Sequence, residues 1–378
     1  MATIGILGGG QLARMLAIAG APLGHRFLVV DSAEDACAAQ VAPLQRADWR
    51  DFDSLARFAA KIDVATFDFE NVPAETAQWL TAHTRVFPNP AALAVAQDRL
   101  VEKTLFGEIG LDTPTFATVD SVDDLRQAVE RTGLPAVLKT RRLGYDGKGQ
   151  FVLRAAADVD NAWQALGGVP LILEAFIPFE SEISVIAVRS RNGEFRHYPL
   201  TRNWHRGGIL SASLAPVVVD EALAQTAVSR ARVLAERLDY VGVFALELFV
   251  SQGRLLGNEM APRVHNSGHW TIEGTACSQF ENHIRAVLGL PLGDTAAQGF
   301  SAMLNWIGAL PDARPVLAEA RAHWHDYGKS PREGRKVGHA TLRADSTGEL
   351  ADRLTRIGRA LGREEHVAPV IEALGNGE

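Results

Sequence analysis

The N-terminal part of the chain alternates between two patterns of apolar and polar residues. Strand-like apolar runs are separated by stretches whose apolar residues recur at helical spacing, and Pro88 and Pro90 end the pattern. Strands that alternate with helices build a parallel sheet with helices on its faces. We therefore predict an α/β unit here. Its segments lie at residues 3–7, 11–19, 27–30, 55–61, 64–67 and 85–87.

The pattern changes after residue 98. Residues 98–110 have the pattern of a helix closed by a glycine, which places a boundary near residue 98. Strand-like segments then follow one another with one helix, 157–166, among them, which predicts an antiparallel α+β arrangement. These strand-like segments lie at residues 136–139, 150–153, 171–175, 183–188 and 195–199.

A hairpin is predicted further along the chain. Residues 243–250 and 254–260 flank the turn Ser251-Gln252-Gly253, and a helix-rich tail is expected from there to residue 378. A three-residue turn pairs Val250 with Arg254 and sets Glu247 opposite Gly257, with Glu259 one diagonal step away on the same face. The two carboxylates are then ~7 Å apart, a separation that can hold magnesium between them.

Composition and charge narrow the class of protein. The 378 residues are 47% hydrophobic, enough for a large core and for two or three domains. The net charge of −7, without a long run of either sign, argues against a nucleic-acid or membrane-surface partner and favours a small molecule. No secretory signal and no membrane-spanning window is found, and Cys37 and Cys277 lack metal-like spacing, so we expect a cytoplasmic protein.

A glycine-rich loop follows the first predicted strand. Gly8-Gly9-Gly10-Gln11-Leu12-Ala13 matches the dinucleotide-binding pattern, with Asp31 at the end of the second strand. The physical content of that pattern is a tight turn that presents backbone N–H groups to a phosphate. The alternative is that glycine merely permits the turn. The loop by itself leaves both interpretations open.

A second glycine-rich loop, residues 138–150, carries basic side chains. Its glycines would let backbone amides approach a polyphosphate, and Lys139 and Lys148 would supply positive charge. The alternative is a solvated hairpin loop that happens to be basic. Tyr145 and Asp146 favour the first interpretation, because a hydroxyl and a carboxylate suit a polar second substrate.

Glu247 lies in an apolar strand, where an unpaired carboxylate is costly, so it needs a cation. Magnesium shared with Glu259 is one solution. A structural salt bridge to Arg263 or another basic group is the other. The polar segment 258–269 that follows favours a site on a rigid hairpin.

At this point the sequence resembles the ATP-grasp superfamily, and within it the N5-carboxyaminoimidazole ribonucleotide synthetases. Nearly the whole chain takes part, and four segments occur in the family's order: residues 8–12, 144–150, 258–269 and 334–339. The resemblance implies a pre-ATP-grasp, Rossmann-like parallel-sheet domain (1–98), an ATP-grasp domain (99–296) with a lid around 115–178, and a small C-terminal domain (297–378). It also implies a homodimer.

The resemblance further implies which residues act. Magnesium would be held by Glu247 and Glu259, and the catalytic residues would be Tyr145, Asp146, Lys148 and Arg263. The ATP site would comprise Arg99, Lys139, Gly144, Tyr145, Asp146, Gly147, Lys148, Gly149, Gln150, Glu174, Ile177, Glu182, His205, Asn258 and Glu259. The aminoimidazole ribonucleotide would meet Gly10, Gln11, Leu12, Glu70, Tyr145, Asp146, Arg263, His265, Asn266 and Ser267, with its phosphate near Lys329, Arg335 and Lys336.

Two positions depart from the related patterns. Lys148 stands where many family members have arginine, which affects the expected bicarbonate contact, because a point charge replaces a fork of donors. Ala261 stands where the wider superfamily has asparagine, which leaves the magnesium set one ligand short of that pattern, although this family generally shares the alanine.

The implied reaction is an ATP-dependent carboxylation in purine biosynthesis. ATP would phosphorylate bicarbonate to carboxyphosphate, whose breakdown in a closed site would deliver carbon dioxide to the amine of the ribonucleotide. Asp146 is the candidate for orienting or deprotonating that amine. The alternatives are a nicotinamide-dependent oxidoreductase, a non-catalytic nucleotide-binding module and, closest in chemistry, a formate-using ribonucleotide transformylase that would share the metal carboxylates.

Overall fold

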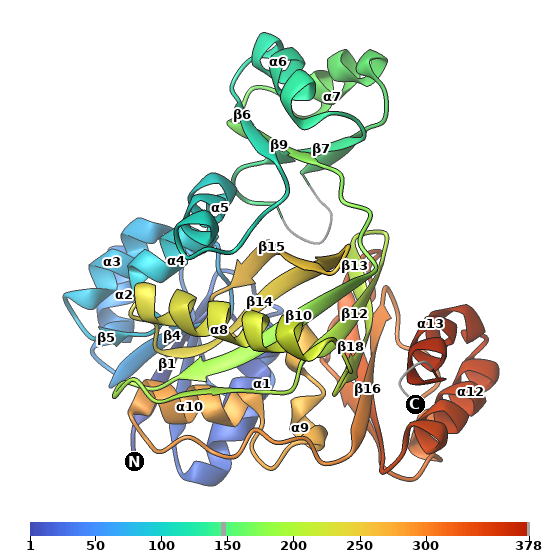
Figure 1. Cartoon of the computed structure of the whole chain (residues 1–378). Coiled ribbons are helices and arrows are strands. Elements are labelled where there is room, and N and C mark those ends of the chain that lie inside the picture. The colour runs from blue at the N-terminus through green and yellow to red at the C-terminus, as the bar shows by residue number, and fades with distance from the viewer. Residues whose placement is uncertain (145–148, 376–378) are drawn as a thin grey trace.

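The computed structural model describes residues 1–144 and 149–375, which form three β-sheets (Figure 1). The N-terminal sheet is parallel, with the order β3-β2-β1-β4-β5, as predicted. Strands β1 and β4 are buried on both faces, and the helices cover the sheet. Its elements are β1 (Thr3–Leu7), α1 (Gln11–Gly20), β2 (Arg26–Asp31), β3 (Leu44–Arg46), α2 (Phe52–Ala59), β4 (Val64–Phe67), α3 (Ala74–Thr81) and β5 (Arg85–Val86).

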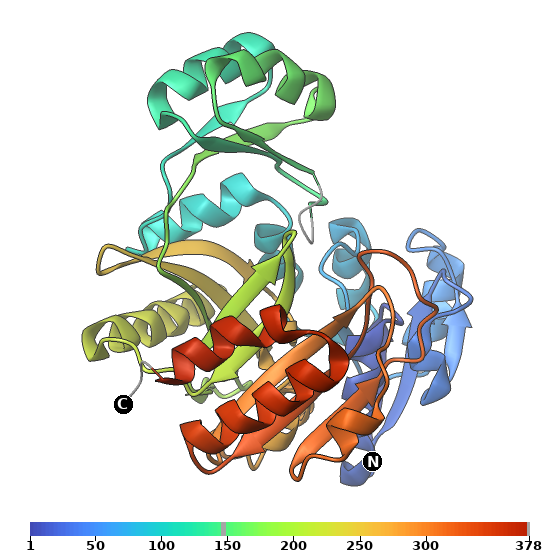
Figure 2. The same cartoon turned by 90° about the vertical axis from the view of Figure 1, so that its right-hand side faces the viewer.

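Two helices, α4 (Pro90–Ala96) and α5 (Arg99–Glu108), lead from this sheet to a small antiparallel unit that we call the lid. The lid has the strand order β6-β9-β7-β8 and a hydrophobic core of its own, and it stands above the rest of the molecule in Figures 1 and 2. Its elements are β6 (Phe116–Val119), α6 (Val122–Thr132), β7 (Ala136–Thr140), β8 (Gln150–Leu153), α7 (Val159–Leu166) and β9 (Leu171–Ala175).

The third sheet has nine antiparallel strands in the order β15-β14-β10-β12-β13-β16-β18-β17, with β11 on β10. Its first part comprises β10 (Ser181–Arg189), β11 (Phe195–His197), β12 (Thr201–Arg206), β13 (Ile209–Ala215), α8 (Glu221–Arg237), β14 (Gly242–Ser251), β15 (Arg254–Ala261), α9 (Thr271–Gly274) and α10 (Gln279–Leu288). The second part comprises β16 (Phe300–Ile307), α11 (Arg314–Leu317), β17 (Ala322–Asp326), β18 (Lys336–Ala344), α12 (Thr347–Leu361) and α13 (Glu364–Gly375).

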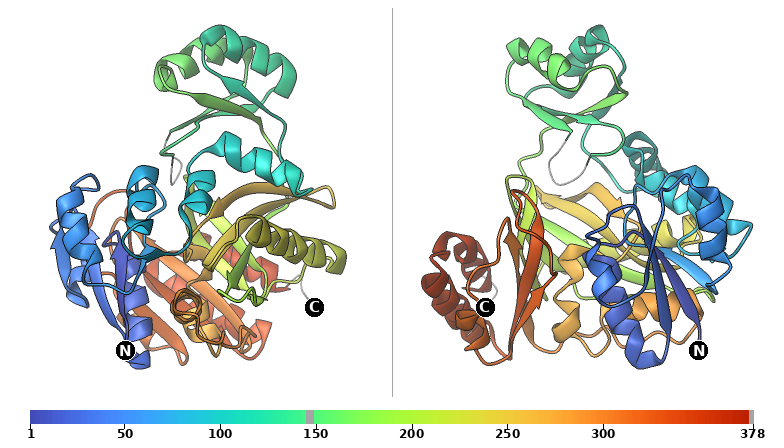
Figure 3. Two further views of the ribbon diagram at one scale, coloured as in Figure 1. Left: turned by 90° about the vertical axis from the view of Figure 1, so that its left-hand side faces the viewer. Right: turned by 180° about the vertical axis from the view of Figure 1, so that it is seen from behind.

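The prediction of a helix-rich tail was wrong for residues 300–344. Three strands lie there, and they extend the large sheet instead of forming a separate helical unit. Strands β16 and β18 are buried on both faces, under α12 and α13 on one side, so their sequences lack the alternation of apolar and polar residues that marks a half-exposed strand. Figure 3 shows these two helices lying against the sheet at the end away from the N-terminal unit.

The N-terminal sheet is fixed to the large sheet through helix α10. Helix α1 packs against α10, and one apolar cluster joins both units. His283 of α10 bridges them: its Nδ1 accepts the Val243 N–H at 3.0 Å, and its Nε2 lies 2.7 Å from the Thr66 hydroxyl in β4. No helix in the described part of the chain has the length and apolar composition that a bilayer span requires.

Candidate active site

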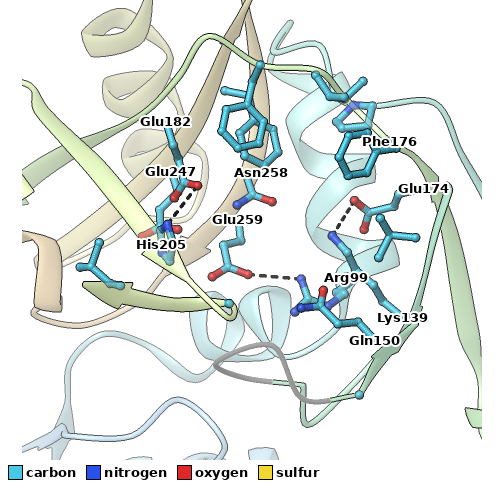
Figure 4. Close-up of a pocket in the computed structure, with 18 of the residues that line it drawn as sticks. Arg99, Lys139, Gln150, Glu174, Phe176, Glu182, His205, Glu247, Asn258 and Glu259 are labelled. Atoms are coloured by element: carbon cyan, nitrogen blue, oxygen red, sulfur yellow. Dashed lines mark hydrogen bonds and ion pairs between the residues drawn. The ribbon is translucent and has the colours of Figure 1, made fainter. Parts of the chain in front are cut away.

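Two neighbouring cavities lie where the lid, the large sheet and the N-terminal unit meet. The first, of about 300 Å³, lies between the lid and the strands β10, β14 and β15, and we call it the lid cavity (Figure 4). The second, of about 710 Å³, lies between the N-terminal unit and the hairpin, and we call it the loop cavity. Both are lined by Arg99, Glu259, His265, Asn266 and Lys336, so groups bound in the two cavities would come into contact.

One end of the lid cavity is lined by apolar side chains. Phe176, Ile177 and Phe179 belong to the segment that connects the lid to β10, and Phe179 stacks on Phe249 with ring centroids 4.5 Å apart. Phe176 and Phe179 are 47% and 45% exposed, which is unusual for phenylalanine beside a core. A planar aromatic ligand would cover these rings.

A buried cluster of opposite charges lies next to that end. One oxygen of Glu174 is 2.9 Å from the Lys139 ammonium and 3.2 Å from that of Lys103. Burial alone would raise the pKa of Glu174, but the two ammonium groups lower it to about 2. Burial lowers the pKa of Lys139. The cluster therefore holds its charges without a ligand.

The hairpin β14–β15 brings Glu247 and Glu259 face to face. Strand pairing joins Ser251 to Arg254, so the turn has two central residues, Gln252 and Gly253, at φ 49° and 70°. Positive φ at both positions is the geometry of a two-residue hairpin turn that matches the strand twist. The predicted three-residue turn was therefore wrong.

A bulge then restores the facing of the two carboxylates. The pairing shifts between Glu247 and Leu248, so that Leu248 pairs with Gly257 and Glu247 pairs directly with Glu259. The predicted partner of Glu247, Gly257, and the diagonal placement of Glu259 were wrong, because the shorter turn shifts the register by one residue and the bulge at Asn258 shifts it by one more. The alternative of a salt bridge from Glu247 to Arg263 is not found, since Arg263 pairs with Glu70.

The carboxylates on this side of the lid cavity repel one another. Burial raises the pKa of Glu247 well above its ordinary value, and the charges of Glu182 and Glu259 raise it further. One oxygen of Glu182 is buried without a hydrogen-bond partner among the described residues, while the other lies 3.3 Å from His205 Nδ1. The described residues contain no set of three or more such side chains that could hold a metal by themselves, but the facing pair Glu247 and Glu259 offers the oxygen ligands that magnesium takes together with nucleotide phosphates.

Cationic and imidazole groups surround the three carboxylates. Arg99 lies 3.2 Å from Glu259, and His265 Nε2 lies 3.4 Å from Glu247. Burial, followed by the positive charge of Arg263, lowers the pKa of His265 well below its ordinary value, so the ring is neutral. Figure 4 shows Glu182, Glu247 and Glu259 on one side of the cavity, opposite Lys139 and Glu174 on the other.

The loop cavity has a basic wall and one strong ion pair. Arg263 donates two hydrogen bonds to Glu70, one of them at 2.9 Å, which joins the hairpin to the N-terminal unit. Burial would raise the pKa of Glu70, but Arg263 holds it below its ordinary value. Lys329 donates to the Gln11 side chain, and Lys336 and Arg335 line the same wall. This wall suits a phosphate group.

Three backbone amides of the glycine loop before α1 are already bound by protein carboxylates. Asp31 accepts the Gly9 N–H at 2.6 Å, and Asp68 accepts those of Gly10 and Ala13 at 2.7 and 2.8 Å. A Cβ on Gly10 would lie 2.5 Å from the Asp68 carboxylate. Glycine is thus needed here for close approach of a protein carboxylate, not of a dinucleotide phosphate. This argues against the oxidoreductase interpretation.

Comparison with known proteins identifies the parts of the chain. Residues 1–97 match a ribonucleotide synthetase preATP-grasp domain, residues 104–280 an ATP-grasp domain, and residues 301–353 a phosphoribosylaminoimidazole carboxylase C-terminal domain. An N5-carboxyaminoimidazole ribonucleotide synthase of Pseudomonas aeruginosa is 55% identical over 94% of this chain and 98% of its own length. The chain belongs to the N5-carboxyaminoimidazole ribonucleotide synthase family.

Solved structures of this synthase family share the whole architecture. The synthetase of Thermus thermophilus superposes with a TM-score of 0.91 at 53% identity, over 94% of this chain and 98% of that one. The synthase of Aspergillus clavatus in complex with ADP and 5-aminoimidazole ribonucleotide superposes with a TM-score of 0.86 at 29% identity, over 99% of both chains. A nucleotide and a ribonucleotide are thus bound together by a protein of the same fold.

The structure brings nearly all the residues expected from the synthase family to the two cavities. The lid cavity is lined by Lys139, Gly149, Gln150, Glu174, Ile177, Glu182, His205, Glu247 and Asn258, the loop cavity by Gly10, Gln11, Leu12, Glu70, Gly144, Arg263, Lys329 and Arg335, and both by the five shared residues. Tyr145, Asp146, Gly147 and Lys148 lie outside the described residues. Ser267 is the exception: it is fully buried behind His265 and lines neither cavity.

The sequence did not predict three charged residues that lie beside the two cavities. Lys103 is buried in α5 and shares Glu174 with Lys139. Glu102, its neighbour, accepts the Met260 N–H at 2.7 Å, and burial followed by the charge of Glu259 raises its pKa to about 8. Asp68 caps helix α1. A lysine and a glutamate on the apolar side of a helix were the available signal for the first two.

Proposed function

We propose that this chain carboxylates 5-aminoimidazole ribonucleotide to N5-carboxyaminoimidazole ribonucleotide, with ATP and bicarbonate, in purine biosynthesis. One observation carries the proposal: Glu247 and Glu259 face each other at the junction of two cavities, one shaped for a nucleotide and one with a phosphate-binding wall. The membership in the synthase family supports the same reaction.

ATP is assigned to the lid cavity. The purine base would lie against Phe176 and Phe179, and the phosphates would extend toward Lys139 and Arg99, which supply positive charge at the far end. Glu247 and Glu259 would hold magnesium beside the phosphates. When bound, that ion neutralises charge on the transferring phosphoryl group.

The ribonucleotide is assigned to the loop cavity. Its phosphate would lie at the wall formed by Lys329, Arg335 and Lys336, and its imidazole near His265 and Asn266, which border both cavities. Because Arg263 is already held by two hydrogen bonds from its guanidinium to Glu70, it is preorganised and loses little freedom when a substrate binds.

The reaction proceeds in three steps. A bicarbonate oxygen attacks the γ-phosphorus of ATP, the bond to the β-phosphate oxygen breaks, and ADP leaves. The carboxyphosphate formed releases carbon dioxide and phosphate. The exocyclic amine then attacks carbon dioxide and loses a proton, for which Asp146 remains the candidate acceptor. The residues listed above position the reactants and exclude water, as in other phosphoryl transfers.

Further assignments belong to the proposal. Residues 1–98, 99–296 and 297–378 are taken as the three domains, with the lid within 115–178. Both cysteines are buried and unpaired, which supports the reducing environment of the cytoplasm. The proposed homodimer rests on resemblance, and sedimentation velocity tests it.

ADP and phosphate release would test the function directly. With the ribonucleotide present, release should require bicarbonate, and formate should not replace it. Release that depends on formate would instead identify the transformylase alternative, and release that is the same with and without the ribonucleotide would refute the assignment of the loop cavity.

A further inference from the structure

A chain of buried polar side chains runs behind His265. Its Nδ1 is 2.8 Å from the Ser267 hydroxyl, and the Ser267 hydroxyl is 3.0 Å from that of Ser184. Asn203 donates to the Ser184 hydroxyl at 2.6 Å and accepts from Ser213 at 2.9 Å. These residues come from β10, β12, β13 and the turn after β15.

The chain lies inside the protein, away from both cavities. Ser184, Ser213 and Ser267 are fully buried and Asn203 is 4% exposed. None of the four lines the lid cavity or the loop cavity. Burying four polar side chains is costly unless each is hydrogen-bonded, and an all-apolar core would avoid the cost. Their arrangement therefore calls for an explanation beyond packing.

The geometry fixes the position of one proton on His265. The Ser267 backbone N–H donates to Nδ1 at 3.3 Å, so Nδ1 must present a lone pair. A neutral imidazole with an unprotonated Nδ1 carries its proton on Nε2. That nitrogen lies 3.4 Å from the nearest oxygen of Glu247. His265 therefore presents an N–H group to the carboxylate.

The serine hydroxyls fit this assignment. Because Nδ1 is an acceptor, the Ser267 hydroxyl has to supply the proton for the 2.8 Å contact. Either hydroxyl of the 3.0 Å contact between Ser184 and Ser267 can supply the proton, and because that of Ser267 is used toward His265, the Ser184 hydroxyl, which accepts from Asn203, is the donor. Along the row Ser213, Asn203, Ser184 and Ser267, each side chain donates a hydrogen bond to the next one toward His265. Asn203 fixes this direction because its amide nitrogen can only donate.

We infer that Ser184, Asn203 and Ser213 are positioning residues that, through Ser267, hold His265 as the Nε2–H tautomer and aim that N–H at Glu247. Carboxylates that bind metal are themselves oriented by hydrogen bonds, and loss of such a partner costs roughly 10- to 100-fold in metal affinity. The consequence for magnesium rests on the proposed function, whereas the tautomer does not.

The tautomer can be read directly from the full-length protein without substrates. Ring nitrogens are labelled with ¹⁵N in histidine, and two-bond ¹H–¹⁵N correlations assign the protonated nitrogen of His265, with His265→Gln to identify the signals. We expect Nε2 protonated in the wild type. Ser184→Ala should shift both nitrogens toward a mixture of tautomers, and Ser267→Ala should do so more strongly. Protonation on Nδ1 in the wild type would overturn the inference.

Ser301→Ala is the matched control. Ser301 is a buried serine in β16 of the same sheet, and its hydroxyl has no hydrogen-bond partner among the described residues, so its loss tests the effect of removing any buried hydroxyl. The apparent affinity for magnesium, measured by titration in the presence of ADP, should fall about 10-fold in Ser267→Ala and stay unchanged in the control.

The outcomes separate the inference from the function. If Ser184→Ala and Ser267→Ala match Ser301→Ala in both tautomer and magnesium affinity, the positioning role is refuted. If Ser184→Ala does not fold, Ser213→Ala at the end of the row replaces it, with a smaller expected shift. Failure of bicarbonate-dependent turnover would refute the proposed function and leave the wild-type tautomer assignment standing.

Discussion

Glu174 and Glu247 are two buried glutamates that line the same cavity, yet their surroundings are opposite. Glu174 is 2% exposed and shares one oxygen between two lysines, and its pKa is about 2. Glu247 is 4% exposed and faces two further carboxylates, and burial together with those charges raises its pKa well above the ordinary value. The protein itself supplies the counter-charge for Glu174, whereas a ligand has to supply the counter-charge for Glu247.

Glu174 is therefore preorganised in the ligand-free protein, whereas Glu247 lacks its counter-charge until a ligand binds. Glu174 and its lysines keep their geometry before nucleotide arrives, so little reorganisation is needed when phosphates bind near Lys139. Glu247 stores electrostatic repulsion in the ligand-free protein, which a divalent cation relieves. The four predictions below test this contrast, from the largest effect to the smallest.

Removal of one charge from the facing pair should abolish turnover. Glu259→Gln keeps the size of the side chain, so the fold should persist, but we expect bicarbonate-dependent ADP production to fall on the order of 1000-fold. The control is Glu281→Gln, which removes a carboxylate from the half-exposed pair with Arg285. Full activity in Glu259→Gln would refute the metal assignment.

Removal of a lysine from the Glu174 cluster should act on stability. Lys103→Met removes one of the two cations next to Glu174 and a donor to the Asn258 carbonyl, and breaking a buried ion pair costs about 3 kcal/mol or more. Urea unfolding measures the loss, with the exposed Lys61→Met as the control. A loss no larger than that of the control would show that Lys139 alone suffices.

The contrast between the two glutamates was only partly predictable from sequence. Both lie in apolar strands, Leu171–Ala175 and Gly242–Ser251, and for Glu247 the need for a cation followed from burial alone. The partner of Glu174 could not be predicted, because Lys103 reaches it from a helix far away in the sequence. Long-range pairing of charges leaves no periodic signal.

For the fold too, local patterns were predictable from the sequence and long-range contacts were not. The parallel sheet of the N-terminal unit was predicted because its strands and helices alternate at regular spacing. The bulge beside Glu247 and the reach of Asp68 to the start of α1 were not, since both depend on how separate segments meet. The expected site residues came from resemblance to a family, whose pattern already reflects which distant segments come together in the fold.

Acid should weaken the Glu174 cluster in a defined pH window. The folded pKa of about 2 lies below the ordinary 4.5, so the stabilisation is complete above pH 4.5 and is lost as the pH falls toward 2. Between pH 4.5 and 3.5 the wild type should lose about 1 kcal/mol more than Glu174→Gln, which lacks the titrating group. Urea unfolding at each pH measures this. Parallel curves for the two proteins would contradict the pairing with the lysines.

Glu247→Gln should have the opposite effect on the ligand-free protein. The amide removes a charge that repels Glu182 and Glu259, and its oxygen can still accept from His265, so we expect the variant to be about 1 kcal/mol more stable than the wild type at neutral pH. Addition of magnesium and ADP should reverse this order, because a ligand stabilises only the protein that binds it. Thermal unfolding with and without the ligands measures both states. If both proteins gain equally from the ligands, Glu247 does not hold the metal.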